Sequence, residues 1–302
     1  MLGTQRGGTT IAGRMMGQVP GFAFLGEFRK LWQVGLPEGR RCGCGKGYDD
    51  CEVWSVVIPK VLGATDVGLI KSWQLKAAPD RLSSLHAWRL ARAGGRGQSA
   101  AVRSYAALLA ATYVSLAETM QTRVLVDTSK LPADAVLVSR LEEVDSFFIE
   151  LVRDPRGTVY SAIRRSGKPA GFHPRQGVGG SAGWLVRHLA ASALRREVGP
   201  SRSMVVTYER LVADPQQVLS EIAAFVGEPG CGSDVMVDGS VPLDVAHTPI
   251  GDGRFGPVCV EFTQDDRWVT ALSTADRLLI SALTRPLARH FGYFRPRAQR
   301  LR

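Results

Sequence analysis

The sequence lacks the features of several protein classes. No apolar run approaches the roughly 18 residues that a membrane-spanning helix requires, and the amino terminus does not read as a secretory signal peptide. Blocks of like charge and strips of alternating basic and aromatic residues are also absent, which argues against nucleic acid as a partner. We therefore expect a cytoplasmic protein without a transmembrane segment, whose oligomeric state the composition leaves open.

Lysine is scarce among the basic residues. Only seven of the 38 cations are lysine, the others are arginine, and the formal net charge is +10. The arginine fork binds phosphate and sulfate through two parallel hydrogen bonds, so this composition favours anionic ligands. At 302 residues, with 45% hydrophobic content, the chain is long enough to bury a sizeable core.

A glycine-rich loop begins two residues after Met1 and reads Gly-Thr-Gln-Arg-Gly-Gly-Thr-Thr over residues 3–10. Glycines let backbone N–H groups turn toward an anion, and the helix that the next residues favour adds the positive end of its dipole. A Walker A loop needs lysine where Thr9 stands, and the only cation here is Arg6. The loop predicts a phosphate or sulfate cradle without magnesium-triphosphate chemistry, the alternative being a structural turn. The first strand is either very short or begins upstream.

A second segment combines an arginine with a strand end. The apolar run 145–152 ends in Arg153-Asp154-Pro155, where proline at the first helical turn and aspartate as its cap predict a strand-to-helix turn. Ser161 follows eight residues after Arg153, about two helical turns later. The pair could grip one phosphate, or they could be a helix-start ion pair with a buried serine.

Together these segments resemble the sulfotransferases that use 3′-phosphoadenosine 5′-phosphosulfate (PAPS), in particular the bacterial carbohydrate and glycolipid branch. In that family a G-x-x-[RK]-[SG]-G-T-[TS] loop binds the 5′-phosphosulfate, and an R-D-P-R-x-x-x-x-S segment binds the 3′-phosphate. The segments at 205–215 and 247–255 are similar to two later motifs of the family, although Asp252-Gly253 replaces Asn-Pro in the second. The resemblance implies a set of nucleotide ligands: Arg6, Gly7, Gly8, Thr9, Thr10, Arg153, Ser161, Tyr208 and Arg254.

The resemblance also implies a fold and an activity. The fold is α/β, one domain over residues 1–302 with a P-loop-like central parallel sheet flanked by helices, and the alternation of apolar and helical segments agrees with it. Residues 42–97 read as a helical insertion that would form a lid over the acceptor pocket. The activity is sulfuryl transfer from PAPS to a hydroxyl, or less readily an amine, of a carbohydrate, glycolipid or small metabolite, with release of 3′-phosphoadenosine 5′-phosphate (PAP) and no required metal. A P-loop nucleotide or small-molecule kinase and an inactive nucleotide-binding regulator are the alternatives.

Candidate catalytic residues also follow from the family. The cytosolic small-molecule branch takes its base from a strand-end histidine, which the segment 127–132 lacks, whereas carbohydrate-acting members use a glutamate near the place of Glu27. Glu27 is therefore the candidate base, with its pKa raised by a hydrophobic floor, or else a residue that only favours a helix start. Arg6 would stabilise the charge on the leaving phosphate. Lys130 would add positive charge or be a solvated lysine, and His86 would line the acceptor pocket.

Three of the five cysteines, Cys42, Cys44 and Cys51, cluster within ten residues. They could be free structural thiols, a disulfide, or three ligands of a metal site whose fourth ligand would come from elsewhere, such as His86 or Asp49. The sequence leaves these alternatives open. Cys231 and Cys259 are isolated and expected to be packed.

Periodicity and turn signals predict the regular elements. The predicted strands, besides one before Gly3, are 123–126, 146–152 and 204–207. The predicted helices are 9–18, 27–34, 100–118, 155–165, 181–197, 215–226 and 274–290.

Overall fold

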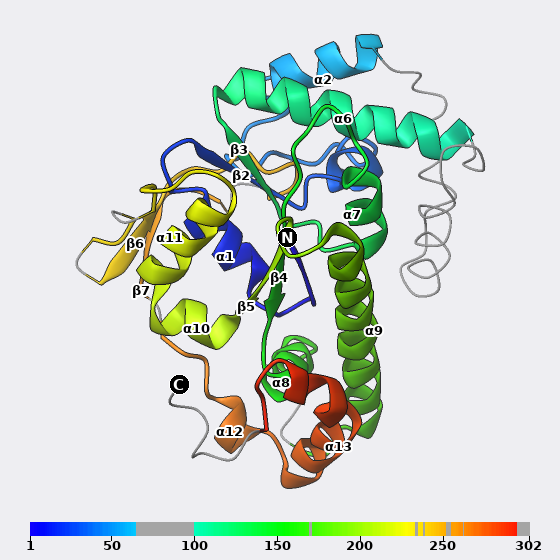
Figure 1. The fold of residues 1–302 in the computed structure, drawn as a ribbon, viewed down its shortest axis with the longest axis vertical. Coiled ribbons are helices and arrows are strands. Elements are labelled where there is room, and N and C mark those ends of the chain that lie inside the picture. The colour runs from blue at the N-terminus through cyan, green and yellow to red at the C-terminus, as the bar shows by residue number, and fades with distance from the viewer. Residues whose placement is uncertain are drawn as a thin grey trace.

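The computed structural model describes residues 1–64, 100–168, 171–232, 235–237, 239–251, 255–261 and 263–294. Its centre is a parallel sheet in which β1 (Leu2–Gly3) pairs with β4 (Phe148–Val152) and β4 with β5 (Ser203–Thr207). Beside it β2 (Phe22–Gly26) pairs in parallel with β3 (Val124–Asp127). A single parallel bridge from Leu2 to Lys130 joins the two parts, which gives the order β2-β3-β1-β4-β5. Figure 1 shows how the helices are arranged around these strands.

Helices cover both faces of this sheet, so its strands are mostly apolar, with Glu150 of β4 a buried exception. On β4, Ile149 and Leu151 pack with α1 (Thr9–Met16), α10 (Tyr208–Ala213) and α11 (Pro215–Phe225). Phe148 and Val152 face the opposite way and pack against α9 (Pro174–Val198). Successive side chains of a strand point to opposite faces, and this alternation places the two helical layers.

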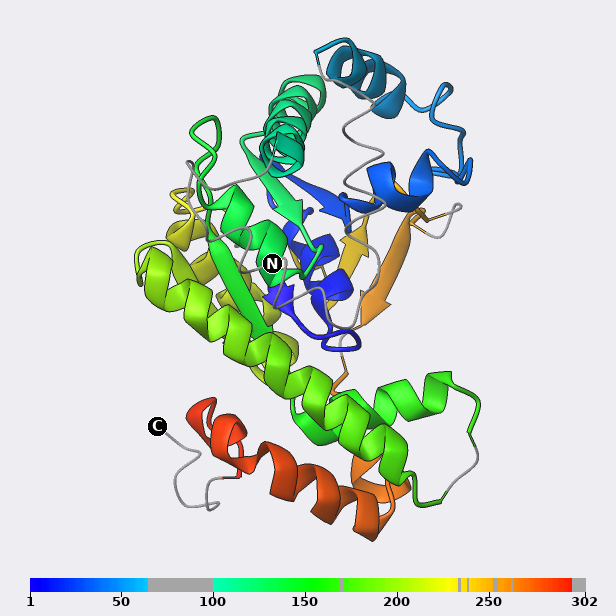
Figure 2. The ribbon, with the colours of Figure 1, turned by 90° about the vertical axis from the view of Figure 1, so that its right-hand side faces the viewer.

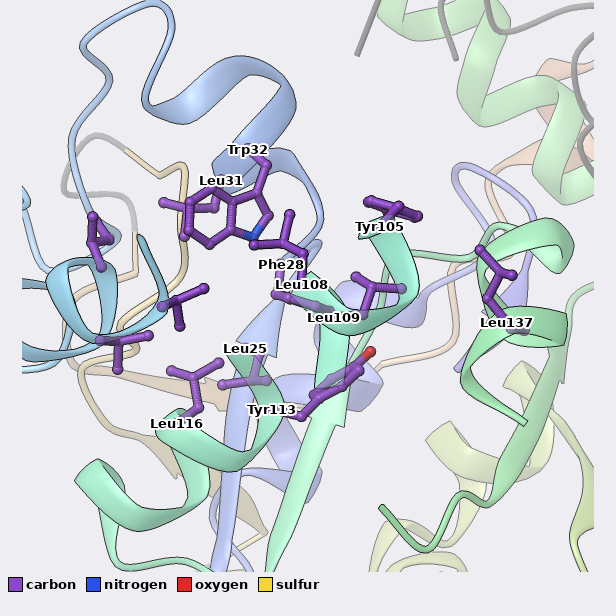
Figure 3. Close-up of a cluster of buried hydrophobic side chains, with 14 of the residues drawn as sticks. Leu25, Phe28, Leu31, Trp32, Tyr105, Leu108, Leu109, Tyr113, Leu116 and Leu137 are labelled. Atoms are coloured by element: carbon purple, nitrogen blue, oxygen red, sulfur yellow. The ribbon is translucent and has the colours of Figure 1, made fainter. Parts of the chain in front are cut away.

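The larger core lies on the α9 side of the sheet. It joins α9 to α6 (Ala100–Met120), α7 (Pro132–Val138), α2 (Trp54–Ala64) and the π-helical turn η1 (Leu31–Gly35). Figure 3 shows Phe28, Leu31 and Trp32 packed toward the leucines and Tyr113 of α6. Phe28 and Tyr113 lie with ring centroids 4.6 Å apart, so this core fixes the chain just after β2.

Three helices from the second half of the chain form a group with α9. Here α8 (Pro155–Arg165) and α13 (Thr274–His290) both pack on α9, with α12 (Trp268–Ala271) against α8 (Figure 2). An antiparallel hairpin of β6 (Ser240–Leu243) and β7 (Val258–Glu261) lies next to α1. Within the described ranges, no helix has both the length and the apolar character needed to cross a bilayer.

On β4, β1 pairs with Glu150 and Leu151. Beside the earlier part of β4 lies a cavity of about 590 Å³, lined by Met1 and by residues of β3 and β4. The two halves of the sheet therefore touch at the carboxyl end of β4 and separate toward its beginning.

The structure confirms the predicted α/β fold with its parallel sheet, and α8 and α13 have the predicted bounds. Three differences have local causes. β2 was not expected, because a five-residue buried run carries no strand alternation. The predicted helix 27–34 is instead the short turn η1. α9 begins at Pro174 and not at 181, because glycines in its first turns weaken the helix signal in the sequence. Gly180 is needed there for packing, since an added Cβ would lie 2.8 Å from Val159.

The helical insertion predicted at 42–97 is seen only in part. Residues 42–53 form loops and turns up to the start of α2, and residues 65–99, including His86, lie outside the described residues. The hairpin β6–β7 was not predicted either, because β6 is only four residues long and contains Pro242, and β7 is mostly exposed.

A buried hydrogen-bonded network ties α9 to the sheet. Glu150 on β4 lies 2.8 Å from Nδ1 of His188 and 3.1 Å from Nη1 of Arg195, and the side chains of Glu150 and His188 are completely buried. Removing one member of such a network leaves the remaining members without a partner in a low-dielectric interior.

We expect Glu150→Ala to lower the free energy of unfolding by about 3–5 kcal/mol, because it leaves His188 and Arg195 uncompensated. Asp145→Ala is the matched control, since Asp145 pairs with Arg202 at the surface and should cost under about 1 kcal/mol. Urea unfolding followed by circular dichroism measures both, and equal losses would contradict the role of the buried pair.

Candidate active site

The glycine-rich loop connects β1 to α1 in a conformation that only a few residue types adopt. Gly8 has φ +94° and is the N-cap of α1, with no side chain capping the helix. Arg6 is also left-handed, with φ +65°. The N–H groups of the first turn of a helix have no acceptor within it, so the start of α1 is open to an anion.

The ring of Tyr208 packs directly against this loop. A Cβ at Gly8 would lie 2.6 Å from Cδ2 of Tyr208, so no larger residue fits there without a shift. On Tyr208 the guanidinium of Arg153 lies 4.4 Å from the ring centroid, within the range of a cation–π contact. Burial raises the pKa of Tyr208, which keeps its hydroxyl protonated.

Arg153 follows β4 and reaches the loop as well. Its Nη1 donates to the carbonyl oxygen of Arg6 at 3.2 Å, and its Nη2 lies 3.2 Å from a carboxylate oxygen of Asp265. Asp154 caps α8 as predicted, accepting from the N–H of Arg156 at 2.9 Å. Arg153 is almost completely buried, so its charge is held in one place at the end of the strand.

Ser161 lies on the buried face of α8, where its Oγ accepts a hydrogen bond from Nε of Arg6 at 3.2 Å. The structure therefore brings together Arg6, Arg153 and Ser161, which the sequence assigned to two phosphate sites, and Tyr208, which it assigned to the nucleotide. The two predicted sites adjoin, because Arg6 contacts Ser161 through its side chain and Arg153 through its backbone.

The electrostatics of this region favour a bound anion. Burial and the neighbouring charges of Arg165, Arg164 and Arg153 lower the pKa of Arg6. Cations this close repel one another, and an anion between them would relieve that repulsion. Hydrogen bonds from Arg267 and Arg153, in that order, lower the pKa of Asp265 to about 2, so Asp265 is a fixed negative partner of Arg153.

Glu27 lies just after β2 in an ion-paired setting that the sequence did not predict. Its Oε1 is 2.6 Å from Nζ of Lys130, and its Oε2 is 2.6 Å from Nζ of Lys30. Burial opposes its ionisation, but the two lysines outweigh burial and the pKa of Glu27 is lowered. The expectation of a raised pKa is therefore wrong. Lys130 is buried, with φ +66°, and is not a solvated lysine.

Five elements of this region follow strand ends at one edge of the sheet. β1 leads into the loop, β2 into Glu27, β3 to Lys130, β4 to Arg153 and β5 to Tyr208. Carboxyl ends of parallel strands meet at the same edge, where open α/β sheets bind ligands. The topology thus places the predicted nucleotide ligands and the candidate base on the same side of the molecule.

Other predicted residues contribute less or lie outside the described ranges. Thr9 is buried at the start of α1, whereas Thr10 is exposed and Gly7 donates its N–H to the carbonyl of Thr4 at 3.1 Å. Arg254 and His86 are outside the described residues. Sequence reasoning missed Asp265, which is 112 residues from its partner Arg153 and belongs to no motif.

The lowered pKa of Glu27 predicts how its contribution to stability depends on pH. A carboxylate whose pKa is depressed by folding adds stability above its unfolded pKa, and that stability is lost as the pH falls through the folded value. We expect wild type to exceed Glu27→Gln in unfolding free energy at pH 7, and the difference to vanish in acid. Denaturant unfolding from pH 7 down to pH 3 measures it. A difference that grows in acid would contradict the ion pair with Lys130 and Lys30.

Comparisons with known proteins agree with this fold. The solved sulfotransferase domain of the curacin biosynthetic pathway shares 18% identity, with 98% of this chain and 97% of that chain covered and a TM-score of 0.55. The sulfotransferase domain of the Synechococcus PCC 7002 olefin synthase shares 19% identity over 98% and 94% of the two chains, with a TM-score of 0.51. At these identities the similarity shows the fold. No curated protein matches significantly.

Residues 60–230, more than half of the chain, match the family described as the sulfotransferase family. The chain belongs to the sulfotransferase family.

Proposed function

We propose that this sulfotransferase takes its sulfuryl group from PAPS and transfers it to a hydroxyl of a carbohydrate, glycolipid or other small metabolite. The observation that carries the proposal is the convergence of Arg153, Ser161 and Tyr208 on the loop at 3–10. PAPS carries two separate phosphate positions, and this region offers two adjoining sets of donors to match them. We further propose that residues 1–302 act as one domain.

The 3′-phosphate is assigned to Arg153 and Ser161. Arg153 is held by Asp265 and by the ring of Tyr208, so its guanidinium is already oriented before the nucleotide arrives. A pre-oriented side chain loses little conformational freedom on binding. The Oγ of Ser161, which accepts from Arg6, would turn its own hydrogen toward the phosphate.

The 5′-phosphosulfate is assigned to the N–H groups at the start of α1, with Arg6 beside them. During transfer the bond from sulfur to the bridging oxygen breaks, and negative charge builds on the phosphate that departs as part of PAP. Arg6 is the cation placed to stabilise that charge, and its neighbours Arg153, Arg164 and Arg165 strengthen the positive potential there. In this mechanism arginine supplies the charge that a metal supplies elsewhere.

Glu27 is assigned the removal of the acceptor proton. Its lowered pKa keeps it ionised at neutral pH, so it is ready to accept a proton, but the two lysines also weaken it as a base. We propose that the sulfonate draws Lys130 away from Glu27 when PAPS binds. Losing that partner would raise the pKa of Glu27 and make it basic only when the donor is present.

Nucleotide choice tests the donor. We expect PAP to bind about 30- to 1,000-fold more tightly than AMP, because contacts to the 3′-phosphate are worth about 2–4 kcal/mol. In Arg153→Ala the preference should shrink by at least about tenfold, since most of that grip is lost. Isothermal titration calorimetry with both nucleotides measures the ratio.

The control for this experiment is Arg202→Ala. Arg202 directly precedes β5 and pairs with Asp145 at the surface. It should keep the wild-type preference for PAP. Equal affinities of wild type for PAP and AMP would overturn the assignment of the 3′-phosphate site, and tightest binding of magnesium-ATP would favour a kinase.

The assigned base predicts a separate defect. Glu27→Gln keeps the shape of the side chain but cannot take a proton, so turnover should fall by about 10²- to 10⁴-fold while PAP affinity changes little. Transfer of label from ³⁵S-PAPS to a panel of carbohydrates, glycolipids and simple alcohols measures turnover. The wild type should also lose activity as the pH falls through the pKa of Glu27, a limb that the variant should lack.

Glu38→Gln is the matched control, because Glu38 is exposed on the turn after η1. It should turn over at the wild-type rate. If Glu27→Gln retains full activity on an acceptor that the wild type sulfates, Glu27 is not the base and its part is limited to the ion pairs with Lys130 and Lys30.

A further inference from the structure

Three cysteines and a histidine converge at one point of the fold, outside the proposed nucleotide site. Cys42, Cys44 and Cys51 come from the loop before α2, and His247 from the segment after β6. Their sulfur and nitrogen atoms all lie within 4.8 Å of one another, and Cys42 and Cys51 are completely buried. The sequence predicted three possible ligands here, and the structure adds His247 as a fourth. Of the two suggested fourth ligands, Asp49 is not in the cluster and His86 lies outside the described residues.

The distances within the cluster fit the edges of a metal-centred tetrahedron. The Sγ of Cys51 lies 3.6 Å from that of Cys42 and 3.9 Å from that of Cys44. With Zn–S bonds of about 2.3 Å, the sulfurs of a tetrahedral site are about 3.8 Å apart. Nδ1 of His247 lies 3.3 Å from the Sγ of Cys51 and 3.9 Å from that of Cys42, where the same geometry places sulfur and nitrogen about 3.5 Å apart.

The histidine is oriented as a metal ligand requires. Its other ring nitrogen, Nε2, lies 3.0 Å from a carboxylate oxygen of Glu52, the residue next to Cys51. A hydrogen bond from Nε2–H to this carboxylate leaves the lone pair of Nδ1 directed at the three sulfurs. Carboxylates commonly fix the tautomer of a metal-bound histidine in this way.

The backbone around the cluster is equally specific. Gly45, at φ +93°, donates to the carbonyl of Cys42 at 2.9 Å, which turns the chain between the first two cysteines and the third. Gly43 donates to the carbonyl of Thr248 at 2.9 Å, and a Cβ at Gly43 would lie 2.4 Å from the Oγ1 of Thr248. The two segments thus approach so closely that only glycine fits between them.

We propose that Cys42, Cys44, Cys51 and His247 bind one zinc ion, as three thiolates and one imidazole. Three soft sulfurs and one nitrogen in a tetrahedron are a typical structural zinc set, and four protein ligands leave no open position for catalysis. The ion holds the loop 42–51 against the segment 246–249. Thr248 of that segment packs on Gly26, where an added Cβ would lie 2.8 Å from its Cγ2, so the zinc braces the wall next to Glu27.

Zinc content of the purified chain tests the proposal without any nucleotide, so its outcome is independent of the proposed sulfuryl donor. We expect about one zinc per chain by mass spectrometry of the metal after expression with zinc. X-ray absorption should show three sulfurs at about 2.3 Å and one nitrogen at about 2.0 Å. Neither measurement on the wild type depends on a variant that folds.

Variants then assign the ligands. Cys51→Ser and His247→Ala should each lose most of the zinc, while His247→Cys should keep it as a four-cysteine site. Cys231→Ser and Cys259→Ser are matched controls that should bind zinc fully, because Cys231 is half-buried elsewhere and Cys259, against expectation, is exposed. A strong chelator should lower the melting temperature of the wild type, but not that of Cys51→Ser.

The proposal would be overturned if the wild type contains no zinc after growth and refolding with excess zinc. So would a disulfide between two of the three cysteines, detected by mass spectrometry of protein prepared under reducing conditions. If Cys231→Ser or Cys259→Ser loses as much zinc as Cys51→Ser, the metal is bound adventitiously.

Discussion

The close packing of Tyr208 on Gly8 is the contact on which the anion site depends. Because residue 8 has no side chain, the ring of Tyr208 can lie against the loop, and the guanidinium of Arg153 lies over the same ring. Arg153 in turn holds the loop through the carbonyl of Arg6. The carbonyl of Arg153 accepts from the indole of Trp184 on α9 at 3.1 Å, so the site is tied directly to the buried helix layer.

The parallel sheet brings the residues of the proposed active site together. Each of its five strands ends at the same edge and delivers one element there, from the loop and Glu27 to Lys130, Arg153 and Tyr208. A displacement of one strand would therefore separate groups that act on one ligand. The buried pair of Glu150 and His188, located on β4 and α9, resists such displacement beneath the site.

The cysteine–histidine cluster adds a second constraint on the opposite flank. It joins the loop before α2 to the segment that packs on Gly26, and so it bears on the position of Glu27 and not on the nucleotide ligands. The donor side of the site rests on arginine, aromatic and backbone contacts, whereas the acceptor side would rest on a metal cross-link. The donor side and the acceptor side of the proposed site are therefore held in place by different kinds of contact.

The sequence by itself determined the features that local backbone geometry imposes. The glycines of the loop, and the aspartate and proline that begin α8, are required where they stand, so the loop before α1 and the strand-to-helix turn could be predicted from residue types and spacing. Only the tertiary structure decided the charge of Glu27, the counter-ion of Arg153 and the fourth member of the cysteine cluster. Their partners lie 103, 112 and 196 residues away, and such contacts leave no periodicity or turn signal in the chain, because folding alone brings the two segments together.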